Sequence, residues 1–130
     1  MKLRYLHLYS KKPIELAQFL ADVFDYVILP TAEDQQIVVQ GDKWSFLVKK
    51  AKAAHLFSSQ GERDVEFEFK LDSIDELEDL GHKIEFHFYR SRGMSPAEFI
   101  KWERSKTESS FYLCDPEERK WRFSAEVREQ

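Results

Sequence analysis

The chain has 130 residues, enough for a single domain that buries a core of its eleven Phe, five Tyr and three Trp without disulfide staples. Its 20 basic and 24 acidic residues are interspersed and give a net charge of −4, so no basic stripe for a nucleic acid is present. The single cysteine, Cys114, excludes an intrachain disulfide and a thiolate zinc cluster. No apolar run approaches the ~20 residues of a membrane span. We expect a cytoplasmic protein without nucleic-acid or membrane partners.

The first half of the chain predicts strand, helix and three strands. Residues 3–10 alternate polar and apolar side chains, which is typical of a half-buried strand. Pro13 opens a helix over residues 13–24, whose apolar stripe follows helical spacing. Three β-rich pieces follow at residues 26–29, 36–40 and 44–49, with Gly41 in the turn between the last two. The lysines at 49, 50 and 52 indicate a solvated strand end.

The second half predicts the same order of elements. Residues 51–64 lack a sustained period and indicate a linker, and residues 65–71 alternate as a strand. Ser73 and Glu76 form a capping box before a short helix over residues 74–80, which Gly81 ends. Residues 84–89 alternate again and predict a strand. Ser95 and Pro96 then start an inserted helix, near residues 95–105, that places Phe99 and Trp102 on one face.

A closing hairpin follows, with the sequence FYLCDPEERKWRF over residues 111–123. Its two strands flank an Asp115-Pro116 turn, and its segment KWRF echoes KWSF at residues 43–46. The echo falls at the same structural step of each half. The chain is therefore expected to be one domain, residues 1–130, made of a first module at 1–50, a linker at 51–64 and a second module at 65–130.

A duplicated strand-helix-three-strand unit that ends in an Asp-Pro hairpin resembles the vicinal oxygen chelate superfamily, which includes glyoxalases, bleomycin-resistance proteins and extradiol dioxygenases. The resemblance implies an α+β fold in which two βαβββ modules form an incomplete barrel, here with a helix inserted in the second module. It also implies a divalent metal on the concave face, with ligands at positions that match Tyr5, Ser45, Glu66 and Arg122. Arginine is a permanent cation and cannot coordinate a metal. We therefore expect no metal at the usual position and no cofactor.

Strand alternation predicts which side chains share the concave face. Apolar residues such as Leu8, Phe69 and Trp121 should face the helices. The side chains expected on the other face, as candidate ligand-binding residues, are Tyr5, His7, Tyr9, Glu66, Glu68, Tyr112, Cys114 and Arg122, together with Lys70 and Lys120. Buried polar groups must pair with one another, with water or with a ligand.

Several alternatives stay open for these residues. Arg122 could form an internal salt bridge with Glu66 or Glu68, or it could anchor an anionic ligand. A register shift of two would bring His7 and Glu68 to the matched positions. His7 and His87, with Glu68 or Glu85, could also form an alternative divalent-metal site. The three tyrosines could stack on a planar ligand or fill the barrel. Cys114 could be a nucleophile if Lys70 or Arg122 lay nearby.

The residues and the resemblance together favour a homodimeric protein of the glyoxalase and bleomycin-resistance type that binds a small molecule without the usual metal. One alternative is a metal-dependent lyase, isomerase or dioxygenase with a relocated site at His7, Glu68 and His87. The other is a non-catalytic dimeric interaction module whose inserted helix is the working surface. Whether the protein is an enzyme is left open by the sequence, because a fold alone does not determine function.

Overall fold

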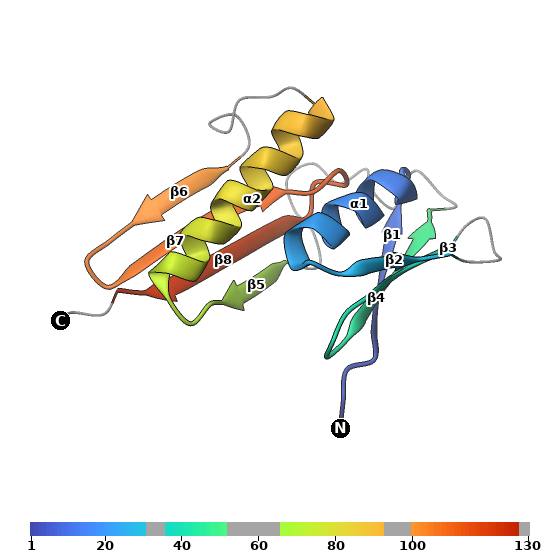
Figure 1. Cartoon of the computed structure of the whole chain (residues 1–130), viewed down its shortest axis with the longest axis horizontal. Helices are drawn as coiled ribbons and strands as arrows, with labels where there is room; N and C mark the ends of the chain where they lie inside the picture. Colours follow the sequence, from blue (N-terminus) through green and yellow to red (C-terminus); the bar gives the residue numbers. More distant parts are fainter. Residues whose placement is uncertain (31–35, 52–65, 93–99, 128–130) are drawn as a thin grey trace. The chain divides into compact units, whose positions relative to one another are not determined.

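The computed structural model describes residues 1–30, 36–51, 66–92 and 100–127 (Figure 1). The chain divides into two compact units, Met1–Glu62 (unit 1) and Arg63–Gln130 (unit 2). Nearly all of the expected linker lies outside the described residues. No helix within those residues has both the length and the apolar character needed to cross a bilayer.

Unit 1 is a four-stranded mixed sheet with one helix. Its elements are β1 (Tyr5–Ser10), α1 (Pro13–Phe24), β2 (Val27–Leu29), β3 (Gln36–Gln40) and β4 (Ser45–Lys50). The strand order is β1-β4-β3-β2, with β1 parallel to β4 and the other pairs antiparallel. The bounds agree with the sequence prediction within two residues at each end.

Helix α1 forms where the sequence placed it. Pro13 occupies its first turn, and the apolar stripe of Leu16, Phe19, Leu20 and Val23 is buried. The helix ends at Asp25, which adopts a left-handed conformation with φ 56° and lets the Tyr26 backbone N–H donate to the Ala21 carbonyl. The helix therefore covers one face of the unit 1 sheet and leaves the other face uncovered by it.

Unit 2 repeats this topology. Its elements are β5 (Phe67–Lys70), α2 (Ile74–Arg92), β6 (Lys101–Arg104), β7 (Glu108–Cys114) and β8 (Lys120–Glu126). The strand order is β5-β8-β7-β6, with β5 parallel to β8. The Ser73 half of the predicted capping box is present, because the Glu76 backbone N–H donates to Ser73 Oγ at 3.1 Å. The Glu76 carboxylate accepts instead from the N–H of Asp72, one residue before Ser73, at 3.3 Å.

The predicted end of the second helix is wrong. Helix α2 continues through Gly81 to Arg92, so the strand expected at residues 84–89 is helical. Its alternating apolar residues suggested a strand, but Leu77, Ile84 and Phe88 are buried at helical spacing against the sheet. Gly81 is needed inside the helix, since a Cβ there would lie 2.8 Å from the Trp102 ring. Tertiary packing therefore overrides the local helix-stop signal.

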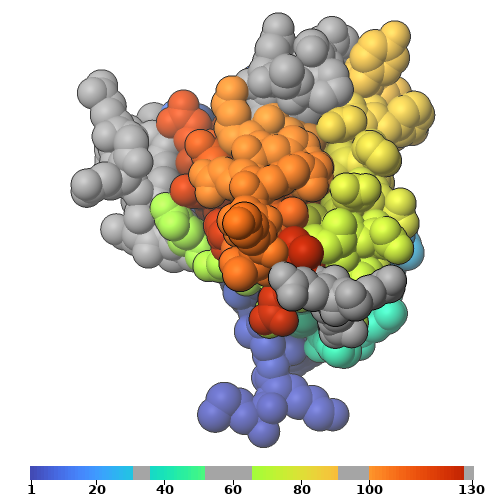
Figure 2. All heavy atoms as spheres, turned by 90° about the vertical axis from the view of Figure 1, so that its left-hand side faces the viewer, coloured from blue at the N-terminus to red at the C-terminus, as the bar shows by residue number. Residues whose placement is uncertain are grey.

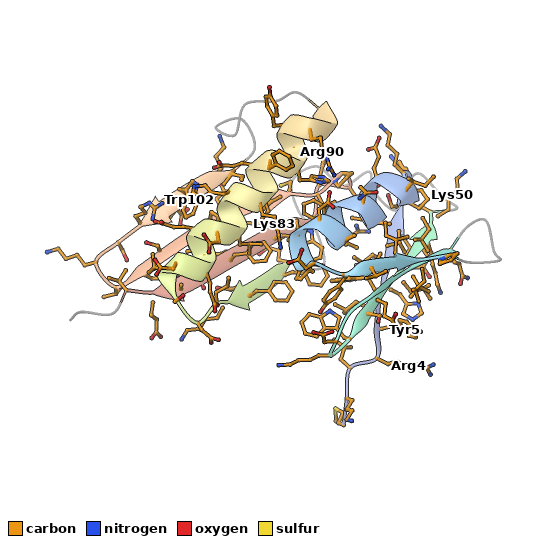
Figure 3. The ribbon with its side chains drawn as sticks, in the orientation of Figure 1. Arg4, Tyr5, Lys50, Lys83, Arg90 and Trp102 are labelled. Carbon is orange, nitrogen blue, oxygen red and sulfur yellow. The ribbon has the colours of Figure 1, made fainter. Side chains whose placement is uncertain are left out.

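The inserted helix is also wrong where the structure describes it. Residues 101–104 form β6, the edge strand beside β7, and Trp102 pairs with Phe111 across the two strands. Figure 3 shows Trp102 between β6 and α2, and in Figure 2 the surfaces of β6 (orange) and α2 (yellow to green) adjoin. Phe99 and the expected helix start lie outside the described residues. Unit 2 still has the predicted order of strand, helix and three strands, with the first of these three strands at 101–104.

Each sheet has a helix face and an open face, the latter being the side turned away from that unit's helix. In unit 2 the helix face is a chain of contacting rings: Trp121 stacks on Phe67 at 4.4 Å between centroids, and Phe123 contacts Phe69 and Phe111 at 5.5 and 5.3 Å. Burying one such side chain contributes about 1.5–3 kcal/mol. This rigid layer fixes which β8 residues point to the open face.

Candidate functional site

The open face of unit 1 carries an aromatic row along β1. Tyr5, His7 and Tyr9 alternate with the inward Leu8 and Ser10, so their side chains share the open face as predicted. Tyr5 and His7 contact edge to face, with ring centroids 6.1 Å apart. The Tyr9 side chain is 44% exposed. The row therefore presents rings to the surroundings of this unit rather than to its core.

Two cations lie against this row. The Arg4 guanidinium carbon is 5.2 Å from the centre of the Tyr5 ring, and Lys49 Nζ is 5.9 Å from the centre of the Tyr9 ring. Lys49 is on the open face because it lies opposite Tyr9 in the parallel pair of β1 and β4. Figure 3 shows Arg4 and Tyr5 beside one another at the start of β1. Both contacts have the geometry of cation–π interactions.

The other strand residues described on this open face are neutral. By register and alternation, the other described strand residues on it are Val27, Leu29, Gln36, Val38, Gln40, Ser45 and Leu47. No Asp or Glu is among these described strand residues. The unit 1 open face is therefore an aromatic and positively charged surface.

The open face of unit 2 is built around Arg122. Its Nη1 donates to Glu68 Oε1 on β5, and its Nη2 donates to Glu108 Oε1 on β7 at 2.6 Å. The hydrogen bond to Glu108 is the main cause that raises the pKa of Arg122, and the charge of Glu68 adds to it although partial burial acts in the opposite direction. Arg122 is thus a fixed cation between two carboxylates.

The reach of Arg122 to Glu108 depends on small neighbours. Arg122 lies opposite Tyr112, whereas Glu108 is four residues further along β7. Between these positions Ser110 and Ser124 face each other and are buried. Their short side chains leave room for the arginine to lie along the sheet. The sequence indicated the partner on β5 but missed Glu108.

Other charges on this face are balanced as well. Lys70 Nζ pairs with Glu126 Oε1 at 2.6 Å, and these two residues border a cavity with Leu71 and Asp72. Lys120 Nζ lies 4.3 Å from the centre of the Tyr112 ring. By register the strand residues described on this face include four basic and four acidic side chains, namely Lys70, Lys101, Lys120, Arg122, Glu68, Glu103, Glu108 and Glu126.

Of the positions matched to the superfamily's ligands, Tyr5 and Ser45 pair with each other across β1 and β4. The residue that pairs with Arg122 is Glu68, while Glu66 is exposed and precedes β5. The salt-bridge interpretation of Arg122 is therefore confirmed for Glu68. Cys114 is exposed and lies opposite Lys120, not beside Lys70 or Arg122 in the register.

The structure does not place the residues of the alternative metal site, His7, Glu68 and His87, together on one face as expected. His87 lies on α2, not on a strand, and is buried beside Phe88, with their rings 5.2 Å apart. Glu68 is on the open face of the same unit, so the unit 2 sheet lies between these two residues. His7 belongs to unit 1. Within the ranges that the structure describes, no three His, Cys, Asp or Glu side chains gather closely enough to hold a metal ion.

The Asp115-Pro116 turn has a structural basis that the sequence did not reveal. The buried Asp115 carboxylate accepts from the backbone N–H groups of Glu117 and Arg119 at 2.8 and 3.1 Å. It also accepts from Trp121 Nε1 at 3.0 Å and from Arg119 Nη1 at 3.3 Å. These bonds fix the start of β8 and, with it, the position of Arg122. The spacing of an aspartate and a tryptophan six residues later was the available signal.

The chain matches no family sequence model and no curated protein. Solved structures are similar over nearly its whole length. A glyoxalase/bleomycin resistance protein/dioxygenase family enzyme from Burkholderia phytofirmans PsJN has a TM-score of 0.68 at 14% identity, covering 98% of this chain and 100% of that one. A genomically encoded fosfomycin resistance protein from Listeria monocytogenes has a TM-score of 0.68 at 16% identity, covering 100% and 94%.

Lactoylglutathione lyase from Agrobacterium tumefaciens is similar at a TM-score of 0.59 and 16% identity, covering 95% of this chain and 92% of that one. At such identities the likeness shows the fold and not the activity. The chain therefore has the fold shared by the glyoxalase, bleomycin-resistance and dioxygenase proteins.

Proposed function

We propose that this chain, which has the fold of the glyoxalase and bleomycin-resistance proteins, binds a small molecule on the open faces of its sheets. We further propose that it does so without the metal-ligand set that the resemblance implies. The side chains assigned to ligand binding are Tyr5, His7, Tyr9, Glu66, Glu68, Tyr112, Cys114 and Arg122.

The pairing of Arg122 with Glu68 and Glu108 is the observation that carries the metal part of the proposal. Three of the four positions matched to metal ligands hold Tyr5, Ser45 and Arg122. The carboxylate next to Arg122 is already taken up by the guanidinium. A divalent cation bound at these positions would lie beside the permanent positive charge of Arg122. It would also have to displace the hydrogen bonds that Arg122 donates to the two carboxylates. A neutral organic ligand meets no such penalty.

Metal analysis and thermal melts test the metal part of the proposal. The protein, purified without chelator, should contain no stoichiometric divalent metal, and its melting temperature should not respond to Mn²⁺, Ni²⁺ or Zn²⁺. Arg122→Glu provides the contrast, because it would place three carboxylates together. We expect that variant to melt at a lower temperature and to be rescued by Mn²⁺. Stoichiometric metal in the wild-type protein, or its stabilisation by these ions, would contradict the proposal.

A library screen tests the small-molecule part. A ligand that binds only the folded state adds about 2.7 kcal/mol of stability at 100 times its Kd. Compounds matched in size but differing in charge and planarity should include several that raise the melting temperature. If no compound class does so, the small-molecule function is wrong.

A dimeric interaction module is the second candidate, favoured by exposed aromatic residues on α2. Phe86 and Tyr89 are 61% and 66% exposed, and the Arg90 guanidinium lies 5.7 Å from the centre of the Phe86 ring. The exposed stripe is acidic near its start, at Asp75 and Asp79, and basic near Arg90. An antiparallel pair of α2 helices from two copies would bring opposite charges together.

Solution mass measurement tests this candidate. We expect Phe86→Glu to shift a dimer toward monomer, while Ile14→Glu, at a 75% exposed position on α1, leaves the mass unchanged. A wild-type monomer, or equal effects of the two changes, would contradict the interaction module.

A further inference from the structure

We infer that the open face of unit 1 recognises a flat ring that carries a negative charge. This inference rests on the proposed small-molecule function and names the ligand class and the unit that binds it. It assigns direct ligand contact to Arg4 and Lys49, and it places the anion contact away from Arg122.

The aromatic row supplies the surface for the ring. Successive open-face residues of a strand are about 6.6–6.8 Å apart, close to the width of a fused aromatic ring system. Tyr5 and His7 support each other edge to face, and the Tyr9 ring is part exposed at the end of the row. A planar ligand lying on this row would therefore contact rings whose orientation is already set.

The two flanking cations supply the charge preference. Within the described ranges, neither Arg4 nor Lys49 forms an ion pair, and each rests on an aromatic ring. The described strand residues of this face include no carboxylate that would neutralise them. An anionic group on a bound ring would supply the counter-charge for these two cations, whereas a cationic group would be repelled.

The open face of unit 2 is the poorer anion site although it contains an arginine. Both terminal nitrogens of Arg122 already donate to carboxylates, and Lys70 is paired with Glu126. An incoming anion would have to displace Glu68 or Glu108 and then lie beside the displaced carboxylate. Lys49 and Arg4, in contrast, lie on a face whose described strand residues include no carboxylate.

Titration with a pair of probes of one shape and opposite charge tests the inference. The probes are 2-naphthoate and (2-naphthyl)methylammonium. Their binding is measured by calorimetry or by NMR chemical shifts. We expect 2-naphthoate to bind at least about tenfold more tightly, corresponding to a difference of about 1.4 kcal/mol. Lys49→Gln should weaken 2-naphthoate binding about fivefold and should not weaken ammonium binding.

Lys50→Gln is the matched control, because Lys50 is the next residue of β4 and alternates to the other face (Figure 3). It should change the 2-naphthoate Kd less than about twofold, the effect of a distant exposed charge. Arg4→Gln and Tyr9→Leu should each weaken 2-naphthoate binding about threefold or more, through charge and stacking respectively. Unchanged melting temperatures of these surface variants confirm that they are folded.

Equal affinity for the two probes, no binding of 2-naphthoate, or equal effects of Lys49→Gln and Lys50→Gln would overturn the inference. In each of these cases the small-molecule function survives if other compounds still raise the melting temperature. If no compound of any charge does so, the proposed function itself fails. The two failures are therefore distinguishable.

Discussion

Units 1 and 2 have the same topology, with a parallel outer strand pair and a helix on one face, but their open faces carry different chemistry. In unit 1 the rings of Tyr5, His7 and Tyr9 lie beside cations, and the strand residues that the structure describes on this face include no carboxylate. In unit 2 Arg122 is held between Glu68 and Glu108. The comparison shows that one copy of a repeated unit can leave cations available to an anionic ligand, while the other copy pairs its arginine with its own carboxylates.

The equivalent hairpin turns of the two units also differ in how they use their charged residues. The turn after β3 contains the exposed Asp42, whereas the turn after β7 contains the buried Asp115. Asp115 joins two backbone amides to the indole of Trp121. Trp44, which matches Trp121 in the sequence echo, contacts the Tyr26 ring edge to face at 6.3 Å instead. Stability in unit 2 therefore depends on polar contacts that unit 1 lacks at this turn.

The largest effect is expected from breaking this turn. Asp115→Ala leaves several buried donors without their acceptor and should lower the free energy of unfolding by about 2–4 kcal/mol. Asp42→Ala, at the equivalent exposed turn, should change it by less than about 0.5 kcal/mol. Urea denaturation of both variants measures the difference. Similar values for the two would show that the turns do not differ as described.

Removing Arg122 should have a smaller effect. Arg122→Met leaves Glu68 and Glu108 without their shared cation, and we expect a loss of about 1 kcal/mol after allowing for solvent screening. The loss should shrink in 1 M NaCl because salt screens the remaining repulsion. Ser45→Ala changes the matching position of unit 1 and should show no such salt dependence. A salt-independent loss in Arg122→Met would argue against the ion-pair account.

Gly81 tests the packing of β6 on α2. Gly81→Ala would gain helix propensity, but its Cβ would lie 2.8 Å from Trp102, so we expect a net loss of about 0.5–1 kcal/mol. In a Trp102→Leu background the same change should instead stabilise the protein by about 0.5 kcal/mol. A double-mutant cycle in urea measures this reversal of sign. The same sign in both backgrounds would contradict the packing described here.

The smallest effect is expected at alkaline pH in unit 1. Burial, with a contribution from Asp42, raises the pKa of Tyr26 above its usual value of 10.0. The folded state therefore holds this proton more tightly than the unfolded state. That contribution to stability is complete below pH 10 and is lost as the pH rises through the folded pKa. Tyr26→Phe should show a shallower decline of melting temperature above pH 10, and an unchanged slope would refute the shift.

Sequence patterns predicted most of the fold because local signals and tertiary packing agree there. The stripe of α1, the alternation of β1 and the Asp115 hairpin each have one consistent interpretation. At residues 84–89 the alternation of Ile84, Phe86 and Phe88 is compatible with a strand and also with a helix that exposes Phe86. Only packing on the sheet decides between a strand and a helix there. The strand β6 was missed for a related reason, since a helix start signal precedes it.

For the candidate site, strand alternation predicted which side chains share a face but not which of them interact. The Glu68 partner of Arg122 followed from neighbouring strands. Glu108 did not, because the arginine reaches it along the sheet past two buried serines. The contacts of Arg4 and Lys49 with tyrosine rings likewise depend on side-chain paths. Such contacts are set by geometry that a pattern of residue types does not specify.

Amide chemical shifts measured by NMR during a titration with 2-naphthoate test the contrast between the two open faces most directly. We expect shifts concentrated in β1 and β4, at Tyr5, His7, Tyr9 and Lys49, and we expect Lys49→Gln to need about fivefold more 2-naphthoate to reach the same shifts. Shifts concentrated instead around Arg122 and Tyr112 in β7 and β8 would contradict it.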